Sequence, residues 1–326
     1  MTSLKNKTIL ITGGAGSLGS ALCEKLKSLN CRVIVFSRDE GKHATIKDSL
    51  PEVETVIGDI RDFEKVNQTF FSHKPDYVIH AAALKRIDDM EIFPDECVKT
   101  NIEGSRNVAK AALLNNVSKC ILISTDKACE PVNVYGCSKF IAERIFTNFD
   151  FHNQGSKTIF SSVRYGNVIA SRGSFIPLFI DKIKNNKPIN VTSNDMTRFL
   201  FTLNDAVNTV IDALVNSFGG EVFVPEINSY TLPLCISALE EILQKKSITK
   251  ISGLRPGEKL HEDMLSITEI PFTYRVPNIN LLQIRPQYTN KKHQDFEKYT
   301  GPHFNSKLWV ESNTETLISL IKSGIS

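Results

Sequence analysis

Four glycines lie within seven residues near the start of the chain, directly after its first apolar segment. Gly13, Gly14, Gly16 and Gly19 follow residues 8–12 and match both the Gly-x-Gly-x-x-Gly and the Gly-x-x-Gly-x-x-Gly pattern. In such a turn, glycine lets backbone N–H groups approach a phosphate at the positive N-terminus of a helix. The pattern is weak by itself, but a strand before it and a helix after it supply the context that it requires. These residues therefore predict a dinucleotide-binding turn, with a glycine-rich turn that binds no ligand as the alternative.

Short, β-branched apolar segments alternate with amphipathic segments through the first half of the chain. The candidate strands are residues 8–11, 32–36, 55–57, 77–79, 120–123 and 158–163. Strands buried on both faces form continuous apolar runs, and helical connections between them imply a parallel sheet with right-handed crossovers. We therefore predict an α/β fold, with a Rossmann-type doubly wound parallel sheet in residues 1–165. Residues 166–326 are expected to form a smaller mixed α/β substrate-binding region, of which about 200–225 packs back on the first domain.

Charge and cysteine content restrict the partners and the compartment. The formal net charge of the 326 residues is only +3, and the charges are scattered, which disfavours nucleic acid as a partner. Apolar runs stop far short of the ~18 residues that span a bilayer, and residues 1–7 do not resemble a secretion signal. Seven cysteines without Cys-x-x-Cys spacing, and histidines without the spacing of metal ligands, fit a reducing compartment. We expect a cytoplasmic protein without membrane insertion and without a metal site.

The end of the second predicted strand bears on the choice of cofactor. An NAD-specific domain normally places an acid there to bind the ribose 2′-hydroxyl, but this chain has Ser37 and Arg38, with Lys42 a turn later. A hydroxyl and two cations suit the 2′-phosphate of NADP, so we predict NADP rather than NAD. In the alternative, Arg38 and Lys42 are solvated surface charges and Asp39 binds the ribose. Further cofactor contacts are expected in the glycine-rich turn and at the ends of the third and fourth strands, namely Gly13, Gly16, Ser17, Leu18, Gly19, Asp59, Ile60, Ala81, Ala82 and Ala83.

A tyrosine and a lysine are spaced to share one face of a predicted helix. Tyr135 and Lys139 are four residues apart, whereas Ile141, Ile145 and Phe149 mark a roughly opposite apolar stripe. An ammonium beside a phenol favours the phenolate and lowers the pKa of the phenol from ~10 toward neutrality. The pair is therefore predicted to accept a hydroxyl proton while the cofactor accepts a hydride. A solvated surface pair is the alternative.

The glycine-rich turn and the Tyr135–Lys139 pair together resemble the extended short-chain dehydrogenases/reductases. Ordinary members have a Ser or Thr after the fifth strand, whereas this chain has Ser124-Thr125-Asp126-Lys127. A ketone at C4 of a sugar acidifies the C5 proton, which an amine can remove, while a carboxylic acid can protonate the departing C6 hydroxyl. Asp126 and Lys127 therefore suggest an elimination between two hydride transfers. An exposed ion pair at the end of the strand is the alternative.

Residues 124–139 resemble the UDP-N-acetylglucosamine 4,6-dehydratases of surface-polysaccharide and flagellin-sugar synthesis. The similarity extends in order over nearly the whole chain, through residues 80–86, 163–168, 171–174, 196–199 and 255–262. It implies UDP-N-acetylglucosamine or a close UDP-sugar as the substrate. The resemblance implies that Lys127 is the C5 base and that Asp126 is the acid that protonates the C6 leaving group. It implies that Tyr135 and Lys139 form the oxidation pair and that Thr125 lies near the C4 oxygen. The implied cofactor contacts are Lys85, Ser124, Tyr135 and Lys139.

The same resemblance implies substrate contacts more loosely. Asn167 and the loop 172–174 are expected to contact the nucleotide-sugar phosphates, and Arg255 and Glu258 the pyrophosphate and the uridine ribose. A simple turn at 255–257 and a surface charge at Arg198 are the alternatives. The full set of expected substrate contacts is Lys85, Tyr165, Asn167, Arg172, Gly173, Ser174, Thr197, Arg198, Arg255 and Glu258.

Tyr rather than Met at position 135 resembles the inverting branch of these dehydratases, in which C5 is reprotonated from the opposite face. The resemblance thus implies NADP-dependent 4,6-dehydration with 5-epimerisation to a UDP-4-keto-6-deoxy-L-arabino-hexose, carried out by a homo-oligomer. A retaining 4,6-dehydratase, a nucleotide-sugar 4-epimerase, and a regulator that binds NADP or a nucleotide sugar without turnover stay open. An epimerase needs no elimination acid or C5 base, so Asp126 and Lys127 favour the dehydratase.

Overall fold

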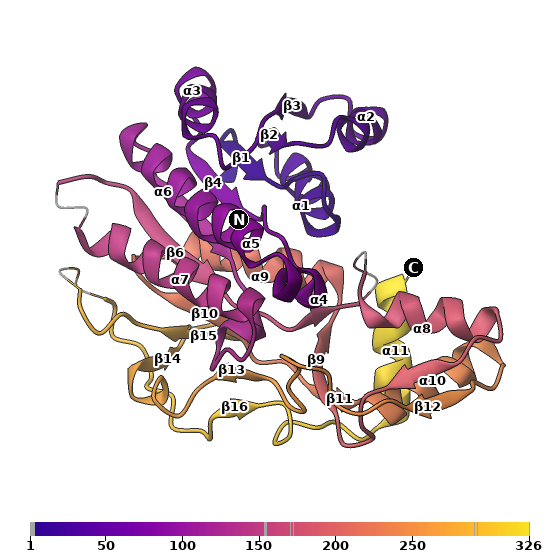
Figure 1. The fold of residues 1–326 in the computed structure, drawn as a ribbon. Helices are drawn as coiled ribbons and strands as arrows, with labels where there is room; N and C mark the ends of the chain where they lie inside the picture. The colour runs from indigo at the N-terminus through magenta and orange to yellow at the C-terminus, as the bar shows by residue number, and fades with distance from the viewer. Residues whose placement is uncertain are drawn as a thin grey trace.

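The computed structural model describes residues 4–152, 155–169, 171, 173–289, 291 and 293–325, and nine strands in these ranges form one sheet. They are β1 (Thr8–Thr12), β2 (Arg32–Ser37), β3 (Glu54–Ile57), β4 (Tyr77–His80), β5 (Lys119–Ile123), β6 (Ile159–Val163), β10 (Val222–Pro225), β14 (Thr273–Arg275) and β15 (Leu281–Ile284). Their order across the sheet is β14-β15-β10-β6-β5-β4-β1-β2-β3 (Figure 1). The strands from β3 to β10 in this order pair in parallel, whereas β15 and β14 add to β10 in antiparallel fashion.

Helices cover both faces of the sheet because side chains along each strand alternate between two apolar clusters. In β1, Ile9 and Ile11 pack into one cluster, and Leu10 packs into the other. The first cluster includes residues of α1 (Ser17–Ser28), α2 (Glu40–Ser49) and α9 (Leu203–Asn216), and the second includes residues of α3 (Phe63–His73), α6 (Gly104–Leu114) and α7 (Val134–His152). The predicted Rossmann-type, doubly wound parallel sheet is thereby confirmed.

Short helices connect the sheet to the helices on its second face. α4 (Ile87–Ile92), α5 (Pro94–Cys97) and η2 (Val98–Glu103) lead from β4 into α6, and η3 (Asp126–Ala128) follows β5 directly. These connections lie at the carboxyl ends of the strands, the edge at which ligands bind in this kind of sheet. None of the helices in the described ranges is long and apolar enough to cross a lipid bilayer.

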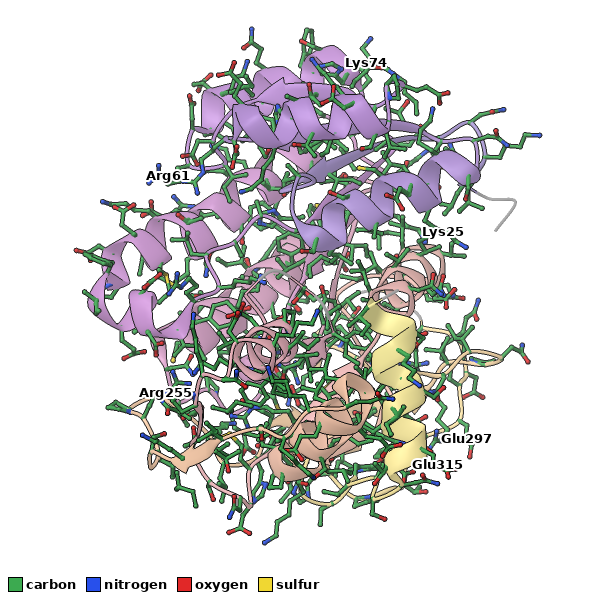
Figure 2. The ribbon with its side chains drawn as sticks, turned by 90° about the vertical axis from the view of Figure 1, so that its right-hand side faces the viewer. Lys25, Arg61, Lys74, Arg255, Glu297 and Glu315 are labelled. Carbon is green, nitrogen blue, oxygen red and sulfur yellow. The ribbon has the colours of Figure 1, made fainter. Side chains whose placement is uncertain are left out.

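The second half of the chain builds a region with a separate apolar cluster at one end of the molecule (Figure 1). Figure 2 shows Glu315, on α11, near this end and Lys74, after α3, near the opposite one. The small sheets are formed by β7 (Asn167–Val168), β9 (Thr197–Phe201) and β11 (Ser229–Thr231), by β8 (Ile189–Val191) and β12 (Thr249–Ile251), and by β13 (Asp263–Leu265) and β16 (Phe304–Asn305). The helices are α8 (Phe175–Lys184), α10 (Leu232–Leu243), η4 (Ile270–Phe272) and α11 (Thr314–Ile325).

This second half also contributes to the large sheet. α9 and β10 fall in the segment 200–225, where α9 packs in the same cluster as α1 and β10 pairs with β6. β14 and β15 extend the sheet further, which sequence patterning did not anticipate. The division into two domains after residue 165 stays a prediction.

A buried arginine joins the large sheet to the second region. Arg164, which follows β6, is fully buried, and its Nη2 lies 2.7 Å from Glu143 Oε2 on α7. Its Nη1 lies 3.0 Å from Glu269 Oε2 and donates to the Met264 carbonyl oxygen at 2.9 Å. Burial opposes ionisation of Glu269, but Arg164 outweighs it and lowers the pKa of this carboxyl to about 2. Because Ser124 Oγ donates to Glu143 as well, the same network reaches the end of β5.

Candidate functional site

The glycine-rich turn joins β1 to α1 at the carboxyl edge of the sheet. Gly13 has a φ of 70°, and a Cβ atom there would lie 2.7 Å from the backbone of Ala82, so a larger residue does not fit. α1 begins at Ser17, and the glycine at its N-cap, Gly16, has no side chain that could cap the helix. The positive end of the helix is thus left for another acceptor, and a phosphate suits it. The turn therefore fits the pyrophosphate of a dinucleotide.

A cavity of about 1710 Å³ extends from this turn to the second region. Sites for drug-sized ligands measure about 300–1,000 Å³, so this cavity has room for a dinucleotide and a second ligand together. The expected residues in its wall are Gly13, Gly16, Ser17, Leu18, Gly19, Ser37, Arg38, Lys42, Asp59, Ile60, Ala81, Ala82, Ala83, Lys85, Ser124, Thr125, Asp126, Lys127, Tyr135, Lys139, Tyr165, Asn167, Gly173, Ser174, Arg198, Arg255 and Glu258.

Two expected substrate contacts are not among these residues. Thr197 is buried behind the cavity wall, where its hydroxyl lies 2.6 Å from Ser306 Oγ and 2.8 Å from His261 Nδ1. Arg172 lies outside the described residues.

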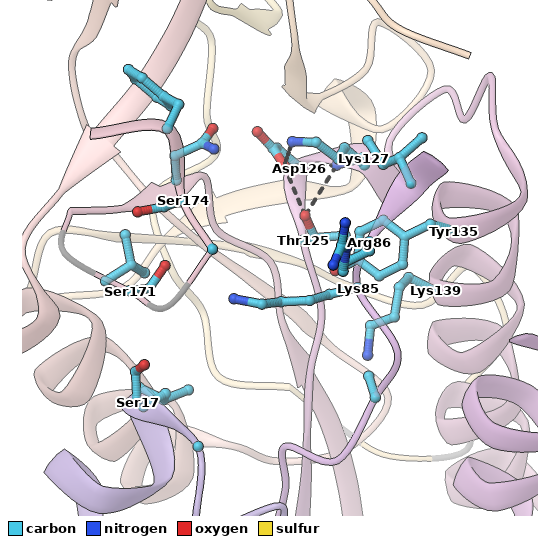
Figure 3. A pocket seen from close by; sticks show the side chains of 18 of the residues that line it. Ser17, Lys85, Arg86, Thr125, Asp126, Lys127, Tyr135, Lys139, Ser171 and Ser174 are labelled. Carbon is cyan, nitrogen blue, oxygen red and sulfur yellow. Dashed lines mark hydrogen bonds and ion pairs between the residues drawn. The ribbon is translucent and has the colours of Figure 1, made fainter. Parts of the chain in front are cut away.

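The acid and the amine after β5 bind each other. Lys127 Nζ donates to Asp126 Oδ1 at 3.0 Å, and the Thr125 hydroxyl donates to the same oxygen at 2.8 Å (Figure 3). The Asp126 backbone N–H donates to the Tyr165 carbonyl oxygen, which fixes the start of η3. Asp126 is fully buried, and its Oδ2 atom finds no hydrogen-bond partner among the described residues. A buried carboxylate oxygen without a partner requires an explanation, and a role of Asp126 in the chemistry of the cavity is one.

The charge of Lys127 is set by its carboxylate neighbours. Burial opposes the ammonium form, but Asp126 and Glu262 outweigh burial and raise the pKa of Lys127 above its ordinary value. In the ligand-free protein Lys127 is therefore an ammonium at neutral pH.

Tyr135 and Lys139 lie on the first turns of α7 and line the cavity beside Thr125 and Lys127 (Figure 3). Burial raises the pKa of Tyr135 to about 12, although the charge of Lys127 acts in the opposite direction. The expected lowering toward neutrality is therefore wrong for the ligand-free protein, because removal of the phenolate from water outweighs the nearby positive charge. Burial also lowers the pKa of Lys139 to about 8, so this ammonium is only partly charged just above neutral pH.

The start of α7 packs tightly against η3. Gly136 lies so close to the carbonyl oxygen of Lys127 that a Cβ atom on Gly136 would overlap it. The Gly136 N–H donates to Asn133 Oδ1 at 2.7 Å, and Asn133 Nδ2 donates to the Gly257 carbonyl oxygen at 2.8 Å. The segment that carries Tyr135 is therefore held against both η3 and the loop 252–258.

Polar groups surround the place where the ribose of a cofactor would bind. Ser37 Oγ lies 2.6 Å from His43 Nε2, and the half-exposed Arg38 lies 3.6 Å from Asp59. Asp39 caps α2 and pairs with Lys42 Nζ at 2.7 Å, so its carboxylate already has two partners. All four side chains line the cavity: Ser37 and Arg38 each contact one partner, and Asp39 is paired with Lys42.

The part of the cavity formed by the second region is also polar. Asn167 Oδ1 and Ser174 Oγ are buried in its wall and lack a hydrogen-bond partner within the described part of the chain. Glu258 accepts hydrogen bonds from Thr192 at 3.0 Å and from Arg255 at 3.0 Å. These groups suit the hydroxyl and phosphate oxygens of a nucleotide sugar.

Three further expected substrate contacts are shaped by their surroundings in the fold. The Arg198 guanidinium donates to three backbone carbonyl oxygens, those of Thr197, Lys259 and Leu260. Burial lowers the pKa of the Lys85 ammonium and raises the pKa of the Tyr165 phenol.

Glu262 is a residue of the cavity wall to which the sequence assigns no role. Its Oε1 atom lies 3.4 Å from Lys127 Nζ, and its side chain is almost completely buried. The only indication in the sequence is its place at the end of the string 255–262. No group of three or more metal-binding side chains is found in the described ranges.

A family model and individual relatives both match this chain over most of its length. The family model described as "Polysaccharide biosynthesis protein" matches residues 9–283. A UDP-glucose 4-epimerase of Rickettsia bellii (strain OSU 85-389) is 37% identical over 333 residues, which cover 97% of this chain and 96% of that protein. A second UDP-glucose 4-epimerase, from Rickettsia conorii (strain ATCC VR-613 / Malish 7), is 37% identical with the same coverage.

Among solved structures, Pen from Bacillus thuringiensis superposes with a TM-score of 0.90 at 33% identity, covering 98% of this chain and 99% of that one. DesIV, a dTDP-glucose 4,6-dehydratase from Streptomyces venezuelae, superposes with a TM-score of 0.69 at 21% identity, covering 78% and 86%. At this identity the similarity to DesIV shows the fold alone. Since the family model spans most of the chain, this protein belongs to the polysaccharide biosynthesis protein family and has the fold of nucleotide-sugar epimerases and dehydratases.

Proposed function

We propose that this protein is an NADP-dependent UDP-N-acetylglucosamine 4,6-dehydratase that also inverts C5. The observation that carries the proposal is the hydrogen bond between Asp126 and Lys127 in the wall of the cavity that Tyr135 and Lys139 also line. Oxidation and reduction at C4 alone require a proton acceptor near C4 but no further acid and amine. A buried acid and amine beside the oxidation pair favour an elimination instead.

The residues can be assigned to the proposed steps as follows. A bound nicotinamide would accept a hydride from C4 and return one at C6. Tyr135 would accept the C4 hydroxyl proton, with Thr125 beside the C4 oxygen and Lys139 favouring the phenolate by its charge.

The elimination itself needs Lys127 as an amine and Asp126 as an acid. Transfer of one proton from Lys127 to Asp126 across their 3.0 Å hydrogen bond produces both forms at once. Lys127 then takes the C5 proton, the electron pair of that bond forms the C5–C6 double bond, and the C6–O bond breaks. Asp126 gives its proton to the departing hydroxyl group, which leaves as water.

The polar groups of the cavity support the proposed cofactor and the proposed substrate. Ser37, Arg38 and Lys42 line the cavity and supply a hydroxyl and two cations for a 2′-phosphate, and Asp39, which pairs with Lys42, lines it as well. Asn167, Ser174, Arg255 and Glu258 support a nucleotide-sugar site. Inversion at C5 rests on the resemblance to the inverting branch, and the homo-oligomeric state stays a prediction.

A nucleotide-sugar 4-epimerase is the second candidate. It is favoured by the Rickettsia relatives, which are named UDP-glucose 4-epimerases and are 37% identical over nearly the whole chain. The buried Asp126–Lys127 pair is the observation against it.

One experiment separates these functions. Purified protein is incubated with UDP-N-acetylglucosamine, and in parallel with UDP-glucose, in heavy water, and the products are examined by NMR. The proposal expects a 4-keto-6-deoxy product from UDP-N-acetylglucosamine with deuterium at C5 and inverted C5 configuration. An intact sugar with inverted C4 would establish the epimerase, retained C5 configuration the retaining dehydratase, and tight binding without turnover the regulator.

A further inference from the structure

A second carboxylate lies against Lys127, on the side of the cavity formed by the second region. Glu262 Oε1 lies 3.4 Å from Lys127 Nζ and 3.8 Å from Arg198 Nε. Glu262 is 2% exposed, and its Oε2 atom is buried without a hydrogen-bond partner in the described part of the chain. Burial of a carboxylate costs free energy, and Lys127 and Arg198 are the cations that compensate for it here.

The fold, rather than Lys127, holds Glu262 in place. The Glu262 N–H donates to Ser306 Oγ at 2.8 Å, and the Ser306 N–H donates to the Glu262 carbonyl oxygen at 2.8 Å. Ser306 Oγ also lies 2.6 Å from the Thr197 hydroxyl, and β13 begins at the next residue, Asp263. The backbone from which the Glu262 side chain extends is therefore fixed by the fold and not by the contact with Lys127.

We propose that Glu262 is a positioning residue for Lys127: it holds the side chain of Lys127 beside Asp126 and keeps it an ammonium until Asp126 takes its proton. The inference rests on the proposed function for the transfer of that proton. The step is balanced within the elimination: Lys127 gains the C5 proton, Asp126 loses one to the departing hydroxyl, and the sugar loses one water. Glu262 keeps its charge throughout and faces the positive charge that forms.

The charged groups around Lys127 agree with this role. Asp126 and Glu262 favour its ammonium form, whereas burial and Arg198 oppose it, and the balance raises the pKa of Lys127. Tyr135 is a titratable group that interacts with Lys127 as well. Asp126 must give up its negative charge to act as an acid, so Glu262 is then the carboxylate that remains to compensate the ammonium.

Glu262→Gln tests the charge, because it keeps the size of the side chain and removes the negative charge. Only the neutral amine reacts with acetic anhydride, so the labelling rate of Lys127 at pH 8.5, read by peptide mass spectrometry, reports the fraction of neutral amine. A decrease of one pH unit in the pKa of Lys127 raises this rate about tenfold, and we expect an increase of this order in Glu262→Gln. Lys127→Ala identifies the labelled peptide.

Glu258→Gln is the matched control for the labelling. Glu258 Oε1 also lies 3.8 Å from Arg198, at Nη2, but its closer partners are Arg255 and Thr192. Removal of this charge is expected to change the labelling of Lys127 by less than about twofold.

Turnover separates positioning from a merely structural role. In Glu262→Gln we expect kcat and the rate of C5 deuterium uptake to fall about tenfold or more, because Lys127 is no longer held in place beside Asp126, with KM for UDP-N-acetylglucosamine within about threefold. Glu262→Asp keeps the charge and should recover part of kcat while its labelling of Lys127 stays close to wild type. It also serves as the test variant if thermal unfolding shows that Glu262→Gln does not fold. If Glu262→Asp then has a low kcat and is labelled at Lys127 much faster than wild type, the charge of Glu262 does not have the proposed role.

The two proposals fail in different ways. Unchanged labelling of Lys127 together with wild-type deuterium uptake in Glu262→Gln would overturn the role of Glu262 even if the wild-type protein is a dehydratase. Suppose instead that Glu262→Gln is labelled faster while the wild-type protein forms no 4-keto-6-deoxy sugar. This combination of results would support the contact of Glu262 with Lys127 and refute the dehydratase.

Discussion

Lys127 Nζ lies 3.0 Å from the Oδ1 atom of the residue that precedes it, Asp126. Successive side chains of an extended strand point to opposite faces, so two neighbours do not normally bind each other. The short helix η3 at the end of β5 turns both side chains to one side, and the Thr125 hydroxyl fixes the carboxylate. An acid and an amine thus share one hydrogen bond in the wall of the cavity.

Replacement of Lys127 by alanine is expected to abolish deuterium uptake at C5 and to leave cofactor binding intact. A positioned proton acceptor contributes about 10²- to 10⁴-fold to rate, and the glycine-rich turn does not depend on this side chain. Product NMR in heavy water and fluorescence titration with NADPH measure the two effects. Lys110→Ala, an exposed lysine on α6, should behave as wild type. Substantial uptake by Lys127→Ala would exclude Lys127 as the base.

Activity is expected to fall as the pH rises through about 8. Burial lowers the pKa of Lys139 to about 8, so the ammonium that assists Tyr135 is present below this pH and lost above it. The pH profile of kcat/KM reports groups of the free enzyme and should show this alkaline limb. In Lys139→Arg the guanidinium stays charged, and the limb should move to higher pH at a lower overall rate. An unchanged limb in this variant would assign it to another group.

Arg38→Ala is expected to weaken NADP binding and to leave NAD binding within about twofold. A hydrogen bond to a charged group contributes about 1.5–3 kcal/mol, which corresponds to roughly a 10- to 100-fold increase in the Kd for NADP. Isothermal titration with both cofactors measures it. Arg32→Ala is the control, because Arg32 pairs with Glu54 at the start of β2 and is absent from the described cavity wall. Equal loss of affinity for both cofactors would argue against a 2′-phosphate contact.

Glu269→Gln is expected to lower the free energy of unfolding by about 1.5–3 kcal/mol at neutral pH, because it removes one of the two carboxylates that pair with the buried Arg164 and leaves Glu143 as the other. Urea unfolding measures the change. Glu240→Gln is the control: the pKa of Glu240 is also lowered to about 2, mainly by the hydrogen bond from Lys246, but that lysine is almost fully exposed. Its loss should cost about 1 kcal/mol or less.

The stability difference between wild type and Glu269→Gln is also expected to depend on pH, with a defined sign. The pKa of Glu269 in the folded protein is about 2, below its ordinary value of 4.5. Its stabilisation is therefore complete above about pH 5 and is lost as the pH falls toward 2. The difference in stability between wild type and Glu269→Gln should shrink over this range, and a constant difference would contradict the pairing.

The sequence predicts well what depends on neighbours along the chain. The continuous apolar run that includes Ile9, Leu10 and Ile11 predicts a strand buried on both faces, and the glycines after it predict the first turn. Both predictions succeed because strand burial and turn geometry depend on residues that are close in the sequence. The spacing of Tyr135 and Lys139 likewise places both on one wall of the cavity.

Long-range contacts and their electrostatics lie beyond such patterns. Glu262 meets Lys127 only after the second region has folded against η3, and the same packing turns Thr197 toward Ser306. The pKa of Tyr135 was predicted in the wrong direction because a sequence shows the neighbouring lysine but not the degree of burial. β14, at the edge of the sheet, and β15, beside it, are short strands, and three or four residues carry too little periodicity to be assigned to a sheet.

The missing side chain of Gly136 has a mechanical consequence. Because Gly136 packs against the backbone of Lys127, the helix bearing the phenol and the turn bearing the amine approach more closely than a larger residue would allow. Under the proposed function, a hexose that reacts first at C4 and then at C5 and C6 would have both groups within a short reach. An alanine at position 136 would push the phenol and the amine apart.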